Sequence, residues 1–154
     1  MPTYNNGAYN RGYGGGGQNR TAPRREYPQP AEIMPEKVPA DYIDRADAIM
    51  RDFSRTITTS KIRNLLSLVS GIYDAEKLRT AKELTEDSVS QLGMMRIRTA
   101  YEAGRDSSVK SFVEKAHLLQ YLKGIGSDRE DLIRFAHYME ALVAYHRFYG
   151  GREG

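Results

Sequence analysis

The stretch from residue 58 to residue 73, TTSKIRNLLSLVSGIY, decides the fold class. Its apolar residues recur at intervals of three and four, at Ile62, Leu65, Leu66, Val69, Ile72 and Tyr73. That spacing places them on one face of an α-helix, as in a helix packed against a core. Thr58 or Thr59 stands where its side chain can accept a backbone N–H of the first turn. The stretch therefore predicts a capped amphipathic helix.

The chain before and after this stretch keeps the helical period, and no proline occurs from Ala40 onward. A first helix is expected to start at Pro39, with an apolar face of Tyr42, Ile43, Ala46, Ile49, Met50 and Phe53. The last helix is expected to start at a capping box of Ser127 and Glu130 and to end at Gly150. Its predicted inward residues are Leu132, Phe135, Ala136, Met139, Leu142, Val143 and Phe148.

The middle of the chain leaves one alternative open. After Asp74, Leu78, Ala81 and Leu84 belong either to a short helix of their own or to the following one, which Thr85 can cap. The expected inward face of that longer helix is Val89, Leu92, Gly93, Ile97, Ala100, Tyr101 and Gly104. Another helix is expected from Ser107 or Ser108 to Gly124, with Phe112, Val113, Ala116, Leu119 and Leu122 inward. The prediction is an all-α fold, a compact bundle of five or six helices over residues 39–151.

Residues 1–38 differ from this body in composition. They hold six glycines, four tyrosines and every proline except Pro39. So few branched apolar residues cannot offset the entropy of ordering, and a disordered tail is predicted. Its tyrosines and arginines suit stacking on single-stranded RNA, but a solvated tail is the simpler interpretation.

Several classes of function find no support in the sequence. The chain has no cysteine, and its net charge of +3 is too small to indicate a nucleic-acid partner by itself. His137 and His146 lie nine residues apart, on opposite faces of one helix, so they cannot share a metal. No nucleotide-binding or hydrolase motif appears, nor a membrane span or secretory signal. We therefore expect a cytoplasmic protein without catalysis, metal or cofactor.

Cations gather in two windows that lack acids. Arg55, Lys61 and Arg63 lie between Asp52 and Asp74, and only Arg96 and Arg98 are charged between Asp87 and Glu102. These side chains border apolar stripes, from which they can reach a phosphate or simply extend to water. Arg105 and Lys110 flank a helix junction where a phosphate is also conceivable. The candidate RNA-binding residues are Lys61, Arg63, Arg96, Arg98, Arg105 and Lys110.

Three segments resemble a known family. They are residues 58–66 (TTSKIRNLL), 98–105 (RTAYEAGR) and 140–151 (EALVAYHRFYGG). In this order they resemble the small subunit of type III-A CRISPR Csm interference complexes, over roughly residues 40–151. The tail lies outside the resemblance.

The resemblance implies a non-catalytic subunit for antiviral defence, stacked in multiple copies along a guide-RNA ribonucleoprotein and holding target RNA. Its implied partners are backbone subunits, a large signalling subunit and further copies of itself. It carries Lys61, Arg63, Arg98 and Arg105 over as RNA contacts, while Arg96 and Lys110 join by proximity. His146 and Arg147 suit a subunit interface, as does Phe148 in an excess of terminal aromatics. The alternative is a purely structural helical adaptor whose basic residues serve protein contacts.

Overall fold

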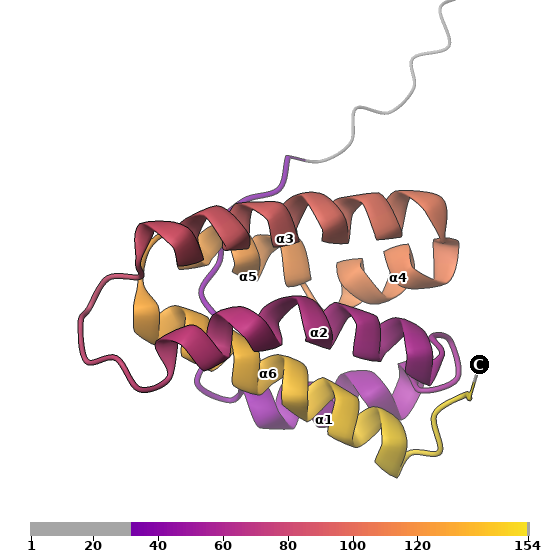
Figure 1. The fold of residues 1–154 in the computed structure, drawn as a ribbon. Helices are drawn as coiled ribbons and strands as arrows, with labels where there is room; N and C mark the ends of the chain where they lie inside the picture. Colours follow the sequence, from indigo (N-terminus) through magenta and orange to yellow (C-terminus); the bar gives the residue numbers. More distant parts are fainter. Residues whose placement is uncertain (1–31, 154) are drawn as a thin grey trace, which may run out of the picture. The chain divides into compact units, whose positions relative to one another are not determined.

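The computed structural model describes residues 32–153, and this part of the chain is all-helical (Figure 1). Its helices are α1 (Tyr42–Phe53), α2 (Thr59–Glu76), α3 (Glu86–Arg105), α4 (Ser107–Lys115), α5 (Leu118–Ile125) and α6 (Arg129–Phe148). The predicted all-α bundle is confirmed. Disorder was predicted for residues 1–38, of which residues 1–31 lie outside the described residues.

The helices form two layers that share one core. α6 packs against both α1 and α2, while α3 packs against α4 and α5. α2 and α3 lie side by side where the layers meet, as Figure 1 shows. The largest fully buried side chains include Tyr138, Phe112, Phe135, Met50 and Ile62. α1, α2, α4 and α6 present the predicted apolar faces to this core, although Ile43 and Phe148 are exposed.

Side-chain caps begin four of the helices. Thr58 accepts the backbone N–H of Lys61, and Thr85 accepts that of Ser88, as the sequence predicted. The cap of α6 is Asp128 rather than Ser127. Ser127 is displaced from the helix because its carbonyl accepts the N–H of Leu84 at 2.8 Å.

The segment predicted as one helix from residue 107 to residue 124 is two helices. The break lies at His117, which adopts a left-handed φ of 56°, and α5 then continues to Ile125. Tyr138 donates its hydroxyl proton to the carbonyl of Ala116 at 3.0 Å, which satisfies an acceptor freed by the break. The bend lets both short helices pack against α3.

Residues 77–85 form a loop, so the short helix around Leu78 is not formed, and Leu78 is 87% exposed. Buried Glu76 anchors the loop by accepting the Thr85 N–H at 3.1 Å and an Arg79 N–H at 2.6 Å. Arg129 donates to the carbonyl of Ala81 at 2.8 Å. Burial alone would raise the pKa of Glu76, but hydrogen bonds from Ser88, Thr85 and Arg79 outweigh it and lower the pKa to about 2.

The inward face of α3 differs from the predicted one. The buried residues are Ser88, Leu92, Met95, Thr99 and Ala103. Apart from Leu92, the residues expected inward are not buried, and Ile97 and Tyr101 are 64% and 61% exposed. The buried residues recur at intervals of three and four along one face of α3, so Ile97 and Tyr101, which lie off that face, are turned outward.

The packed chain begins before the predicted boundary at Pro39. Val38 is buried, Glu36 donates its N–H to the Gln120 carbonyl at 3.0 Å, and Lys37 donates to the Gly124 carbonyl at 2.8 Å. A Cβ at Gly124 would lie 1.8 Å from the Glu36 carbonyl oxygen, so this approach requires glycine. Residues 36–38 therefore pack against the bundle.

Candidate nucleic-acid interface

A groove of about 490 Å³ runs between α2 and α3. It is lined by Lys61, Asn64, Leu65, Ser67, Leu68, Arg98, Glu102, Arg105, Asp106 and Val109. Because α2 and α3 lie alongside each other in opposite directions, the start of α2 faces the end of α3. Three of the six candidate cations, Lys61, Arg98 and Arg105, thereby line one groove. We call the part of the groove that these three cations line the basic half.

Lys61 is held inside the basic half by an acid that sequence reasoning missed. Its Nζ lies 2.6 Å from Asp106 Oδ2 and 3.4 Å from Ser108 Oγ. Asp106 is also the N-cap of α4, accepting the backbone N–H of Ser108 at 2.9 Å. Hydrogen bonds from Lys61 and Ser108 lower the pKa of Asp106. The Asp106-Ser107-Ser108 sequence is typical of an N-cap, but it does not reveal the distant lysine.

Arg105 also has an internal partner, although a weaker one. Its Nε lies 3.7 Å from Glu102 Oε2, and its guanidinium carbon lies 5.8 Å from the centre of the Tyr101 ring. The Arg105 side chain remains 62% exposed. An exposed pair at this distance contributes little to stability, so the guanidinium remains available to another anion.

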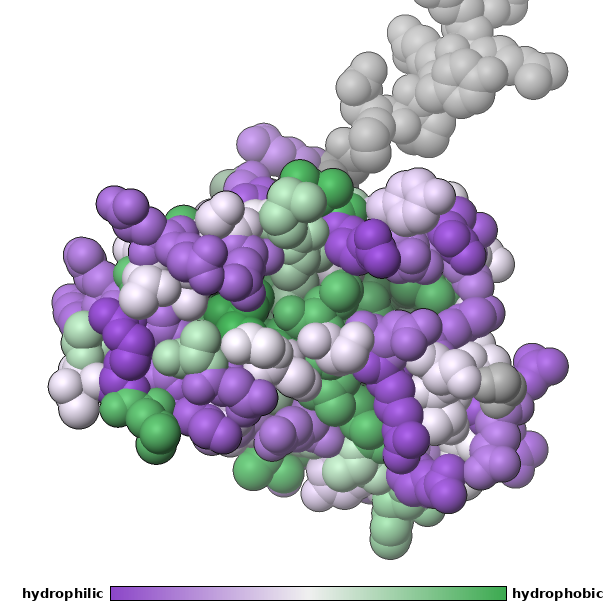
Figure 2. All heavy atoms as spheres, viewed as in Figure 1, coloured by the Kyte–Doolittle hydropathy of each residue, from purple (hydrophilic) through white to green (hydrophobic). Residues whose placement is uncertain are grey.

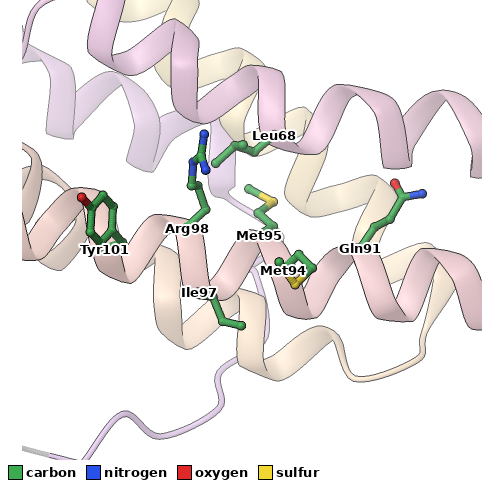
Figure 3. Close-up of a pocket in the computed structure, with 7 residues that line it drawn as sticks. All are labelled: Leu68, Gln91, Met94, Met95, Ile97, Arg98 and Tyr101. Carbon is green, nitrogen blue, oxygen red and sulfur yellow. The ribbon is translucent and has the colours of Figure 1, made fainter.

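Arg98 is the cation of the basic half with no ion pair to any residue in the range 32–153. Its side chain extends from α3 toward α2 (Figure 3). The other candidates lie outside this half and are exposed. Arg63 lies on α2 and Lys110 lies on α4. Arg96 lines a neighbouring cavity together with Ile33 and Leu119. The structure thus brings three of the six predicted RNA-binding cations together in one groove.

The groove continues beyond Arg98 into an apolar half of about 620 Å³. Its lining residues are Leu68, Gln91, Met94, Met95, Ile97, Arg98 and Tyr101 (Figure 3). Figure 2 shows hydrophobic side chains in the hollow between the two helices and hydrophilic ones beside it. The sequence did not predict this apolar half, because the apolar pattern of α3 had been interpreted as placing Ile97 and Tyr101 in the core.

The three predicted interface residues at the end of α6 fall into different environments. His146 is 1% exposed, and its Nε2 donates to the carbonyl of Ile57 at 2.7 Å. This interior position removes the His146 side chain from any interface in the folded chain. Arg147 is exposed and pairs with Glu153 at 2.9 Å, and Phe148 is 76% exposed. Phe148 and Arg147 remain accessible to a partner.

The helices of residues 32–153 offer neither a metal site nor a membrane span. No group of three His, Asp or Glu side chains there could hold a metal ion. His137 instead lies 3.4 Å from the hydroxyl of Tyr73. None of the six helices combines the length and hydropathy needed to cross a bilayer.

Comparison with known proteins identifies the family. The family described as Csm2 Type III-A matches residues 36–152. A CRISPR system Cms protein Csm2 of Streptococcus thermophilus is 44% identical over 119 residues, covering 73% of this chain and 94% of that protein. A protein of the same name from Mycobacterium tuberculosis is 36% identical over 112 residues, covering 70% and 90%. The chain therefore belongs to the type III-A Csm2 family, the small-subunit family that its sequence segments resemble.

Proposed function

We propose that this protein is a non-catalytic small subunit of a type III-A CRISPR ribonucleoprotein, stacked in multiple copies and binding the backbone of target RNA through the α2–α3 groove. Family membership supports the place in the complex. The convergence of Lys61, Arg98 and Arg105 on one groove supports the RNA contact. Arg98 carries the proposal, because its guanidinium has no ion pair within the described chain and faces the groove.

Binding of this kind is independent of sequence. Lysine and arginine side chains that contact phosphates fix position and supply affinity, but they do not distinguish bases. In a guide-RNA complex, pairing with the guide supplies the sequence recognition. The proposed role is therefore to hold the target strand along the assembly.

The alternative function is that of a structural adaptor whose cations stabilise protein. The 2.6 Å ion pair between Lys61 and Asp106 favours it, because this pair joins α2 to the start of α4. Exposed Phe148 and Arg147 suit a contact with a neighbouring copy or another subunit in either case. The two functions differ in what Arg98 does, since this groove cation has no internal ion pair within the described chain.

The test is RNA binding by the full chain carrying Arg98→Gln and Arg105→Gln, two cations that line the groove, measured by filter binding over a salt series. We expect weaker binding of single-stranded RNA and a shallower slope of log affinity against log salt. The slope should fall by about 0.7 for each phosphate that the variant no longer neutralises. The matched control is Lys82→Gln with Arg134→Gln, two cations that lie outside the groove.

A second measurement separates the two functions. Both double variants are combined with the other purified subunits of the complex, and assembly is followed by size-exclusion chromatography. Normal assembly with weakened RNA binding supports the proposal. Failed assembly with unchanged RNA affinity supports the structural adaptor, and equal salt slopes for the two double variants contradict RNA binding in the groove.

A further inference from the structure

The apolar half of the α2–α3 groove exposes large hydrophobic side chains that the bundle does not need for its own packing. Met94, Ile97 and Tyr101 are 62%, 64% and 61% exposed, and all three lie on α3. Leu68 approaches from α2, and the groove opens between it and α3, with Ile97 at the outer edge and pointing away from α2 (Figure 3). A contiguous apolar surface of this kind, bordered by polar residues, is typical of a binding site.

The apolar half is continuous with the basic half. Leu68 and Arg98 line both halves, so Arg98 marks the boundary between them. A ligand held at Arg98 by an anionic group can therefore place an adjoining apolar group between Leu68 and Met94. A nucleotide has this chemistry, with a charged phosphate joined through its sugar to a flat base.

We propose that the apolar half holds an unpaired base of the RNA strand whose phosphates lie in the basic half, an inference that rests on the function proposed above. Bases without a pairing partner stack on aromatic side chains, and Tyr101 supplies such a ring. The Arg105 guanidinium, 5.8 Å from the ring centre, supports the orientation of that ring. A paired base keeps both faces covered within the duplex, so the site selects an unpaired one.

The lining residues also indicate how selective the site is. Gln91 contributes an amide that both donates and accepts hydrogen bonds, so it can meet the edge of any base. The only charged side chain lining the apolar half within the described chain is Arg98, a cation, which suits an anionic strand. We therefore expect base binding without strong preference among the four bases.

The experiment compares two RNA probes on the full chain by fluorescence anisotropy. One is a short oligouridylate, and the other is an abasic oligoribonucleotide of equal length, which keeps the phosphates and sugars. The variant Met94→Ala/Tyr101→Ala removes two of the exposed apolar side chains that line this half, without changing the charge. The control is Leu78→Ala, an exposed apolar residue on the loop at residues 77–85. Circular dichroism confirms that each variant keeps its helices.

We expect the double variant to bind oligouridylate about tenfold more weakly than the wild type. Its affinity for the abasic probe should match that of the wild type, and Leu78→Ala should change neither. Unchanged oligouridylate binding by the double variant would overturn the inference while leaving backbone binding intact. A variant that binds both probes normally but no longer assembles with the other subunits would show a protein-docking groove instead. If the wild type bound neither probe, the proposed function itself would fail.

Discussion

The α2–α3 helix pair is held at each end by a carboxylate, and the two carboxylates differ in exposure. At one end, the Glu76 side chain is 0% exposed and ties the end of α2 to the start of α3. At the other end, the Asp106 side chain is 26% exposed and links Lys61 of α2 to the start of α4. Both carboxylates hold helices together, but only Asp106 is exposed enough for its partner to be exchanged for solvent or a ligand.

The difference separates a structural end from a binding end. A buried acceptor cannot be replaced by water, so each of its donors would be left unsatisfied if it were removed. A partly exposed ion pair is screened by water and salt and contributes much less. The groove cations that we assign to RNA all lie at the Asp106 end, where Lys61 can leave its internal partner for a phosphate.

The largest expected effect is on stability, from Glu76→Gln. The amide keeps the shape of the side chain but removes a negative charge that Arg79 and Thr85 contact. We expect a decrease of about 2 kcal/mol in the free energy of unfolding and a lower melting temperature by about 5–8 °C. Urea unfolding and thermal scans measure both quantities. A change no larger than that of Lys77→Gln, whose ion pair with Asp74 is exposed, would contradict the buried-anchor interpretation.

The pH dependence of stability should also distinguish the two ends. Folding lowers the pKa of Glu76 from 4.5 to about 2. The ionised carboxylate therefore stabilises the fold above pH 4.5, and this stabilisation is lost as the pH falls from 4.5 to about 2. The pKa of Asp106 is also lowered, from an ordinary value of 3.8, so its contribution is lost only at lower pH.

The measurement is urea unfolding of the wild type, Glu76→Gln and Asp106→Asn from about pH 6 to about pH 3. Glu76→Gln should remove the part of the acid-induced destabilisation that begins near pH 4.5. Asp106→Asn should retain that part. Identical pH profiles of unfolding free energy for the wild type and Glu76→Gln would show that folding does not lower the pKa of the Glu76 carboxyl.

The helix period and the helix caps show what sequence reasoning could predict. The period of α2 and the cap at Thr85 depend on local chemistry and were predicted, and the cap of α2 was predicted as Thr58 or Thr59, of which the structure has Thr58. The face of α3 was not predicted, because hydropathy selected Ile97 and Tyr101 whereas the folded helix buries the polar residues Ser88 and Thr99. The left-handed turn at His117 likewise has no local sequence pattern, since its position depends on packing against α3 and α6.

The binding end was predicted in its residues but not in its arrangement. Arg98 and Lys61 were named from acid-free windows and from the family resemblance. Their meeting in one groove depends on how α2 and α3 align, and the acids beside them, Glu102 and Asp106, lie on later turns. No one-dimensional pattern shows that Lys61 of α2 will meet an acid at the far end of α3, on the other side of the loop at residues 77–85.

The smallest expected effect, and the sharpest test of the comparison, comes from Asp106→Asn. Asparagine still caps a helix, so α4 should persist, and only a slight change in melting temperature is expected. The substitution frees the Lys61 ammonium, which should strengthen binding of single-stranded RNA about two- to fivefold at low salt. Glu102→Gln, which frees Arg105 in the same groove, is the matched control and should act in the same direction. Filter binding over a salt series measures the RNA affinity of both variants. Weaker or unchanged binding by Asp106→Asn would mean that Lys61 serves the fold alone. Arg98 and Arg105 would then be the RNA contacts of the groove.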